Sequence, residues 1–404
     1  MNIREVIQSD IEKSIKNCGL GLVVPVNVAY PTDLTHGDYT TNWPLQAAQK
    51  LQQSPLEVAR KIEAIFVKSE VYNPPTVAEP GFLNFNLKPD FLAKHLRLAV
   101  AEGDKFGFGS LGAGKKVIIE FSSPNIAKPM HIGHLRNTNI GQAISNILSY
   151  NGYQTITDNH IGDWGTQFGK LLYAYKSWGK EILQPRVDDL LSLYVKFHSE
   201  AAANPELDSL ARLEFKKLED GDAENRELWE RFRKISLAEF ERVYQELGVS
   251  FTTQFGESFY EKDLSKLVTQ VLASGAGRKD PDGSVIIPLE GLPPFLILKS
   301  DGATLYGTRD LATAKYRIDN IKPDQVLYVI GTEQSLYMQQ LFAALKKLGW
   351  GENINWKHIS YGLTRLPQGK MSTRAGEMVT AEEILTEAYA KAEQTIGQKD
   401  GQIK

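Results

Sequence analysis

Two histidines separated by an isoleucine and a glycine, His131 and His134, are the first candidates for chemistry in this chain. They stand in the run SSPNIAKPMHIGHLR, between an expected strand and an amphipathic helix. A helix N-terminus there offers free N–H groups and a positive dipole end to a phosphate, and Gly133 lets a planar adenine or ribose approach the backbone. Imidazoles at this point could donate hydrogen bonds to phosphoryl oxygens as charge accumulates. The alternative is a chance HxGH tetrapeptide, against which its position after the strand argues.

A basic segment near the C-terminus, KMSTRAGE from Lys370 to Glu377, is the second candidate. Lys370 is a mobile point charge that could neutralise a leaving pyrophosphate, and Ser372 and Thr373 could donate hydrogen bonds to it. Taken alone, the segment is better interpreted as a solvated basic loop. Together with the HxGH segment, in the opposite half of one split fold, it indicates nucleotide chemistry far more specifically.

The elements that must position these residues alternate between strand and helix. The run VIIEFSS from Val117 predicts a short buried strand, and Ile140, Ile144 and Leu148 share one face of the helix that follows. The alternation repeats with a strand at 155–157, a helix near 167–178, the strand QVLYVIG, a helix at about 335–348 and the strand HISYG. This pattern predicts an α/β fold with a parallel, doubly wound sheet that binds ligands at the carboxyl ends of its strands.

Composition shifts divide the chain into segments. Residues 1–112 open with a helical pattern at Val6, Ile7, Ile11 and Ile15 and end in a Gly-rich linker from Gly103 to Lys116. The linker lacks GxxxxGK[ST] spacing and precedes a strand, so it is not interpreted as a phosphate loop. The segments that follow are 113–187, the first half of a nucleotide-binding fold; 188–295, an insertion with a long helical, charge-rich part; 296–385, the second half; and 386–404, the start of a helical connection.

The overall composition is that of a globular protein. The chain has 404 residues, 42% of them hydrophobic, a net charge of −3 and a single cysteine, Cys18. It offers no intrachain disulfide and no cysteine cluster for zinc. No apolar run approaches the roughly 18 residues that span a bilayer, and the N-terminus is polar. We expect a soluble, cytoplasmic protein with no membrane partner, in which nucleic-acid binding would need local basic patches.

The two segments together resemble the HIGH and KMSKS signatures of class I aminoacyl-tRNA synthetases. The runs EFSSPNIAKPMHIGHLRNTNIGQAISNIL, NHIGDWGTQFGKLL, LYGTRDLATAKYR and MSTRAGE resemble arginyl-tRNA synthetases. HGDYTTNWPLQAAQKL and EPGFLNF resemble the N-terminal tRNA-binding domain of that family. The resemblance implies a Rossmann-like catalytic domain with a connective insertion, preceded by a small α+β domain over residues 1–112.

The resemblance also implies an arginine site. A guanidinium group pairs best with a bidentate carboxylate, and Asp310 with Tyr306 in YGTRD would supply the acid and the aromatic hydroxyl. The implied arginine-binding set is Glu120, Ser122, Asn125, Tyr306, Asp310, Gln334 and Glu257. Two alternatives stay open: Asp310 could cap a helix starting at Leu311, and Glu120, in an apolar strand, requires a partner if it is buried. Asp163, Trp164 and Gly165 could form a tight turn with a packed Trp instead of a ligand contact.

The nucleotide and tRNA sites follow from the same resemblance. His131, His134 and Lys370 are the expected catalytic residues, and the expected ATP-binding set is Pro124, Asn125, Ala127, Lys128, Pro129, Met130, His131, Ile132, Gly133, His134, Met371, Ser372, Thr373 and Arg374. We expect Mg²⁺ to travel with the nucleotide, without a metal site of the protein's own. Tyr39, Asn42 and Phe82 are candidates for tRNA contact, although aromatic residues such as Phe82 and Phe85 are more often structural.

The implied reaction is the formation of arginyl-adenylate from arginine and ATP, followed by transfer to the 2′-hydroxyl of the terminal adenosine of tRNA(Arg). In this family the first step usually requires bound tRNA. Family members continue into a helical anticodon-binding domain, whereas this chain stops at GQKDGQIK, so we expect that domain to be missing or supplied elsewhere. We expect a monomer. The competing interpretations are a non-catalytic tRNA-binding synthetase remnant and a small nucleotidyltransferase.

Overall fold

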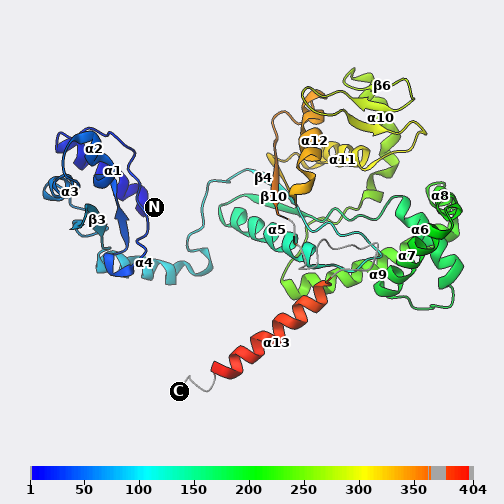
Figure 1. Ribbon diagram of the computed structural model, residues 1–404, viewed down its shortest axis with the longest axis horizontal. Coiled ribbons are helices and arrows are strands. Elements are labelled where there is room, and N and C mark those ends of the chain that lie inside the picture. The colour runs from blue at the N-terminus through cyan, green and yellow to red at the C-terminus, as the bar shows by residue number, and fades with distance from the viewer. Residues whose placement is uncertain (1, 363, 365–378, 400–404) are drawn as a thin grey trace. The chain divides into compact units, whose positions relative to one another are not determined.

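The protein is described here from a computed structural model that covers residues 2–362, 364 and 379–399. The chain divides into two compact units, Met1–Phe108 and Gly109–Lys404 (Figure 1). Each unit has a hydrophobic core of its own, and the second unit contains both halves of the predicted nucleotide-binding fold.

The first unit packs helices against a small antiparallel sheet of order β1-β3-β2. The strands are β1 (Tyr39–Thr41), β2 (Thr76–Ala78) and β3 (Phe82–Phe85), and the helices are α1 (Ile3–Asn17), α2 (Trp43–Leu51), α3 (Pro55–Ala64) and α4 (Pro89–Glu102). Ile7, Ile11 and Ile15 are buried on one face of α1, which confirms the predicted helical pattern. Helix α3 begins with a capping box, in which Ser54 and Glu57 each bond the other's backbone N–H.

The second unit is built on a four-stranded parallel sheet of order β10-β9-β4-β5. The strands are β4 (Lys116–Glu120), β5 (Gln154–Asp158), β9 (Gln325–Gly331) and β10 (Asn355–Tyr361). All four correspond to strands expected from the sequence, and the parallel, doubly wound α/β prediction is confirmed. Because the strands are parallel, their carboxyl ends meet along one edge of the sheet.

Both faces of this sheet are covered. Successive side chains of a strand point to opposite faces of the sheet. In β4, Val117 and Ile119 belong to the hydrophobic core on one face, and Ile118 belongs to the core on the other. The first core packs against α5 (Ile132–Tyr150) and α6 (Thr166–Ala174), and the second against α10 (Leu264–Ala273), α11 (Tyr306–Tyr316) and α12 (Ser335–Lys347). Burial on both faces explains why the two central strands, β4 and β9, are almost continuously apolar.

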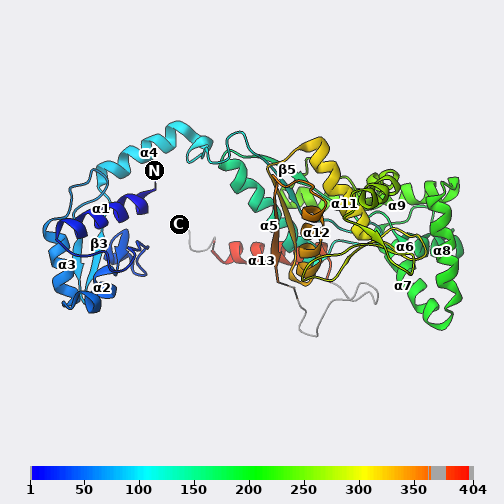
Figure 2. The same cartoon turned by 90° about the horizontal axis from the view of Figure 1, so that it is seen from above.

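The insertion between the two halves is mainly helical. Helices α7 (Val187–Ala203), α8 (Glu206–Glu219) and α9 (Ala223–Leu247) lie with α6 at one end of the unit in both views (Figure 1 and Figure 2). The turn-rich stretch after them contributes to a small antiparallel sheet of β6 (Arg278–Lys279), β7 (Val285–Ile287) and β8 (Phe295–Leu298). The last helix, α13 (Ala381–Lys399), contacts the unit through its first turns and then projects from it (Figure 1). Within the described ranges, no helix is both long and apolar enough to cross a membrane.

Candidate active site

A cavity of about 440 Å³ opens at the carboxyl edge of the parallel sheet. It is lined from both halves of the fold, which are separated in sequence by the insertion. Of the residues expected from the sequence, ten line it: Glu120, Ser122, Asn125, His131, Gly133, His134, Glu257, Tyr306, Asp310 and Gln334. The cavity therefore brings the HxGH turn and the expected arginine-binding residues into one space.

The two histidines form the first turn of α5. Nδ1 of His131 accepts the Gly133 N–H at 3.1 Å, and Nδ1 of His134 accepts the His131 N–H at 3.2 Å. The rings are stacked, with centroids 3.9 Å apart. Burial, together with the charge of Lys128, lowers the pKa of both rings, that of His134 to about 3. Two neutral rings that accept at Nδ1 must carry their proton on Nε2, so each retains one N–H donor for a ligand.

The segment between β4 and α5 has an unusual backbone. Ser122, Ser123 and Ala127 have φ values of 71°, 49° and 63°, a left-handed conformation that is unfavourable for residues other than glycine. Distant side chains hold this shape: Asn137 accepts the Ser122 N–H at 3.0 Å, and Ser236 accepts the Ala127 N–H at 2.8 Å. The strain is thus concentrated where a ligand would approach the backbone.

Glu120 has the partner that its burial requires. It ends β4 with 7% of its surface exposed, and the guanidinium of Arg317 donates to its Oε2. The same nitrogen of Arg317 also donates to Asp158, which lies beside Glu120 in the register of β4 and β5. One buried cation therefore holds two carboxylates at adjacent strand ends. Arg317 was not predicted from the sequence.

Asp310 lies inside a helix, because α11 begins at Tyr306. The alternative that it caps a helix starting at Leu311 is therefore wrong. Its carboxylate accepts a hydrogen bond from the Tyr337 hydroxyl, while burial raises its pKa. Tyr306 stands one turn earlier, 60% exposed, with its ring centroid 5.0 Å from that of Tyr337. Burial raises the pKa of nearby Glu257 to about 7, although Arg309 lies 3.5 Å away.

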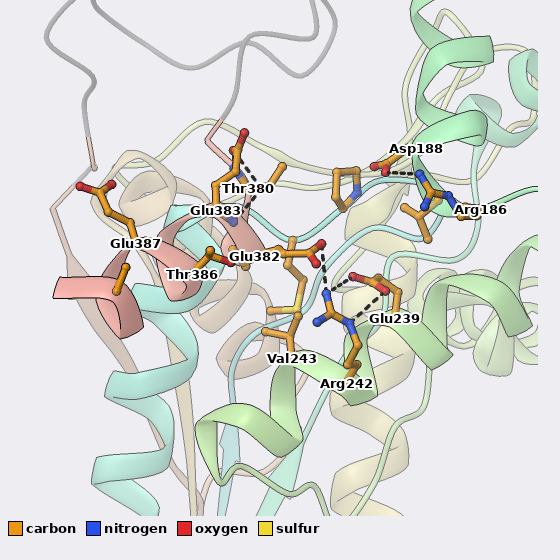
Figure 3. Close-up of a pocket in the computed structure, with 15 residues that line it drawn as sticks. Arg186, Asp188, Glu239, Arg242, Val243, Thr380, Glu382, Glu383, Thr386 and Glu387 are labelled. Carbon is orange, nitrogen blue, oxygen red and sulfur yellow. Dashed lines mark hydrogen bonds and ion pairs between the residues drawn. The ribbon is translucent and has the colours of Figure 1, made fainter. Parts of the chain in front are cut away.

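Several expected ATP-binding residues lie outside this cavity. Pro129 and Met130 instead line a second cavity of about 840 Å³, between α9 and the start of α13 (Figure 3). Lys128 stands over the ring of Tyr194, 4.4 Å from its centroid. Pro124, Ala127 and Ile132 do not line the first cavity. Lys370, Met371, Ser372, Thr373 and Arg374 lie outside the described residues.

The HxGH turn is bonded to the start of α13. The Ile132 N–H donates to the Val379 carbonyl at 3.1 Å, and the Ala381 N–H donates to the Met130 carbonyl at 2.8 Å. Ala381 is buried in the core shared with α5. The residues that follow the KMSTRAGE segment, from Val379 onward, are therefore hydrogen-bonded directly to the histidine turn.

The DWG group has a structural environment. Trp164 is 2% exposed and packs edge-on against Trp229 and Phe215. Asp163 is fully buried and accepts hydrogen bonds from Arg233 and from Ser258. These contacts favour the packed turn over a ligand contact.

The tRNA candidates belong to the first unit. Tyr39 is buried in its core, next to the ring of Tyr30. Asn42 is the N-cap residue of α2, although its side chain makes no capping hydrogen bond, and Phe82 begins β3 half-buried. Phe85, on the same strand, is fully buried, in agreement with its structural interpretation.

Sequence reasoning missed other residues that line the cavity. These are Ser123, Asn137, His160, Gly162, Tyr328, Val329, Ile330, Gly331, Glu333, Tyr337, Met338, Leu341, Tyr361 and Thr364. Gly331 and Tyr361 end β9 and β10, so the rule that ligands bind at carboxyl ends of parallel strands could have found them. No local signal indicates Tyr337, which reaches the cavity from α12.

The comparisons with known proteins agree with this geometry. Residues 96–404 match the family described as "tRNA synthetases class I (R), catalytic domain", and residues 3–87 match "Arginyl tRNA synthetase N terminal domain". The arginine–tRNA ligase of Clostridium perfringens is 44% identical over 330 residues, 80% of this chain and 58% of the relative. That of Clostridium botulinum (strain Loch Maree) is 41% identical over 382 residues, 93% of this chain and 67% of the relative.

Two solved structures share the fold. The arginyl-tRNA synthetase of Plasmodium falciparum aligns with a TM-score of 0.71 at 25% identity, covering 99% of this chain and 69% of that one. That of Thermus thermophilus aligns with a TM-score of 0.68 at 22% identity, covering 100% and 72%. The chain spans 58% of the length of the Clostridium perfringens ligase and 67% of that of the Clostridium botulinum ligase. On the strength of the matched domains and these relatives, the chain belongs to the arginyl-tRNA synthetase family of class I aminoacyl-tRNA synthetases.

Proposed function

We propose that this chain activates arginine with ATP and transfers it to the 2′-hydroxyl of the terminal adenosine of tRNA(Arg). One observation carries the proposal: a single cavity combines the two neutral histidines of the HxGH turn, each with an Nε2–H donor, and the carboxylates of Glu120, Glu257 and Asp310. The donors suit a triphosphate, and the carboxylates suit an amino acid with two cationic groups.

For the nucleotide, His131 and His134 would donate to phosphoryl oxygens while arginine's carboxylate attacks the α-phosphate in line. The N–H groups of Ile132 and Gly133 in the first turn of α5 are bonded within the chain, so the positive dipole end of this helix and the backbone around Asn125 would hold the rest of ATP. Lys370, with Met371 to Arg374, would neutralise the leaving pyrophosphate from the opposite half. Mg²⁺ would arrive on the nucleotide, held by its phosphate oxygens.

For arginine, Asp310 and Tyr306 would bind the guanidinium group, with Glu257 as a second acid. Glu120, Ser122, Asn125 and Gln334 would hold the α-amino and carboxylate groups. The proposal is supported by the bonding of Glu120 and Asp310, whose protein partners fix their positions at the cavity wall.

The domain roles follow the same scheme. Residues 1–112 would contact tRNA through Tyr39, Asn42 and Phe82; 113–187 and 296–385 would form the split catalytic domain; 188–295 would be its connective insertion, and 386–404 a connection toward an anticodon-binding domain. We propose a cytoplasmic monomer.

The deciding experiment measures ATP–pyrophosphate exchange and adenylate formation by this chain with each amino acid, with and without tRNA. We expect product with arginine alone among the amino acids, and only weak exchange when tRNA is absent. Product only with lysine or glutamate would end the arginine assignment. No product under any condition would favour a non-catalytic tRNA-binding remnant.

A further inference from the structure

His160 is a buried side chain of the cavity to which the scheme above gives no role. It lies two residues beyond the end of β5, lines the cavity and is 9% exposed. Within the part of the chain that the structure describes, neither Nδ1 nor Nε2 of its ring has a hydrogen-bond partner. A buried polar atom without a partner is unfavourable, so such groups are normally satisfied by a ligand or by ordered water.

The backbone around His160 is held on both sides. The Asn159 N–H donates to the Thr253 carbonyl at 3.0 Å, and the Gly162 N–H donates to the Pro124 carbonyl at 3.1 Å. Between them, the Ile161 carbonyl accepts the Glu257 N–H at 3.0 Å. The imidazole is therefore presented to the cavity by a fixed segment, to which the backbone of Glu257 is hydrogen-bonded.

The charged neighbours of the ring are mostly acids. Burial lowers the pKa of His160, and the positive charge of Arg317 acts in the same direction. The negative charges of Glu120, Asp310 and Asp158 raise it by more, so the pKa lies above the ordinary value. On the remaining side the ring faces Tyr260, with centroids 5.8 Å apart. Glu257 also interacts with the ring, since the charge of His160 lowers the pKa of that carboxyl. The carboxylates of Glu120, Asp310 and Glu257 are thus close enough to His160 for their charges and that of the ring to influence one another.

The hydrogen-bonding capacity of these groups is complementary. Carboxylates only accept, whereas a neutral imidazole has one donor and one acceptor nitrogen. A ligand with ammonium and guanidinium groups brings donors, and its positive charge favours the neutral form of an adjacent ring. The ring can then donate to a carboxylate of the wall and accept from the ligand, which satisfies both nitrogens.

We infer that His160 is a substrate-contact residue, whose ring accepts a hydrogen bond from a cationic N–H of the bound amino acid and donates to a neighbouring carboxylate. This inference rests on the proposed function, since it takes arginine as the occupant. It adds an imidazole acceptor to the carboxylates and neutral side chains already assigned to the site.

Calorimetric titration of the full chain with arginine, at a pH of about 8, tests the inference without requiring catalysis. His160→Phe keeps the size of the ring but removes both nitrogens, and we expect it to weaken arginine binding about tenfold. ATP binding should change less than about twofold. Asn offers polar atoms near the position of Nδ1, and Gln near that of Nε2, so one of His160→Asn and His160→Gln should recover much of the affinity.

The matched control is His95→Phe, because His95 lies on α4 in the other unit, its ring nitrogen bonded to the Phe91 carbonyl. It should bind arginine like the unmodified chain. Agmatine, which lacks the carboxylate but keeps both cationic groups, tests the direction of the hydrogen bond: His160→Phe should weaken its binding as much as that of arginine. If His160→Phe bound agmatine as tightly as the unmodified chain does, the assignment of the ring as a hydrogen-bond acceptor would be overturned.

The two hypotheses fail in different ways. If the unmodified chain binds arginine and His160→Phe binds it equally well, only the inference about His160 is overturned. If the unmodified chain binds no arginine, the proposed function is overturned, and the inference with it. If the Phe variant does not fold by circular dichroism, the Asn and Gln variants decide: about a fivefold difference in affinity between them supports the inference, and equal affinities contradict it.

Discussion

Arg317 and Glu120 form a buried ion pair beneath the cavity, although 197 positions separate them in the sequence. Arg317 is 1% exposed and shares the same guanidinium nitrogen with Asp158. Since Glu120 and Asp158 end adjacent parallel strands, their negative charges would repel each other without this cation. Glu120 lies in the first half of the fold, and Arg317 directly follows α11 in the second half. The pair therefore connects the two halves.

The first prediction concerns the stability of this connection. Arg317→Met leaves two buried carboxylates without their cation, so we expect the catalytic unit to lose about 3–5 kcal/mol of unfolding free energy. Urea denaturation followed by tryptophan fluorescence measures the loss. Lys391→Ala, which breaks an exposed pair with Glu387 on α13, is the control and should leave the urea midpoint unchanged. An unchanged midpoint in Arg317→Met would contradict the role assigned to the pair.

The second prediction separates the two functions of His134. In His134→Asn the amide oxygen can still accept the His131 N–H, but the Nε2–H donor is lost. We expect tRNA-dependent adenylate formation to fall about 10²- to 10³-fold in kcat, with a much smaller change in the KM for ATP. His134→Gln, which returns a donor near the position of Nε2, should recover part of the rate. A loss confined to the KM for ATP would assign His134 to ground-state binding instead.

Local patterns made the histidine turn predictable, because HxGH, the strand before it and the helix after it are contiguous in sequence. The strand order β10-β9-β4-β5 interleaves both halves of the fold and has no local signal. Long-range partners could not be predicted for the same reason: the sequence indicated that a buried Glu120 requires a partner, but nothing near it in sequence pointed to Arg317. The start of α11 was expected too late, since its cap is Leu305, whose backbone N–H is bonded by Thr308 instead of by an Asx or Ser side chain.

The third prediction is a pH dependence of arginine binding. Burial raises the pKa of Glu257 to about 7, so this carboxyl is largely protonated below that pH and anionic above it. A cationic ligand prefers the anion, so arginine affinity should increase as the pH rises from about 6 to about 8. Calorimetry across this range should give a shallower profile for Glu257→Gln. An identical profile in the variant would show that Glu257 does not face the bound cation.

The last prediction concerns the cavity beside α13. Arg242 of α9 pairs with Glu382 on α13 at 3.1 Å and with Glu239 on its own helix (Figure 3). It also pairs with Glu246, on the same helix. Because Arg242 and Glu382 are both exposed, a double-mutant cycle of Arg242→Ala and Glu382→Ala should give a coupling of only about 0.2–1 kcal/mol, which salt reduces.

Adenylate formation should change less than about twofold in these variants, since the Met130 and Ile132 backbone bonds to α13, and not the ion pair, fix the histidine turn. Parallel assays of stability and exchange check both expectations. A rate that fell more than tenfold while the stability stayed constant would mean that the charge on Arg242, and through it the position of α13, controls the histidine turn.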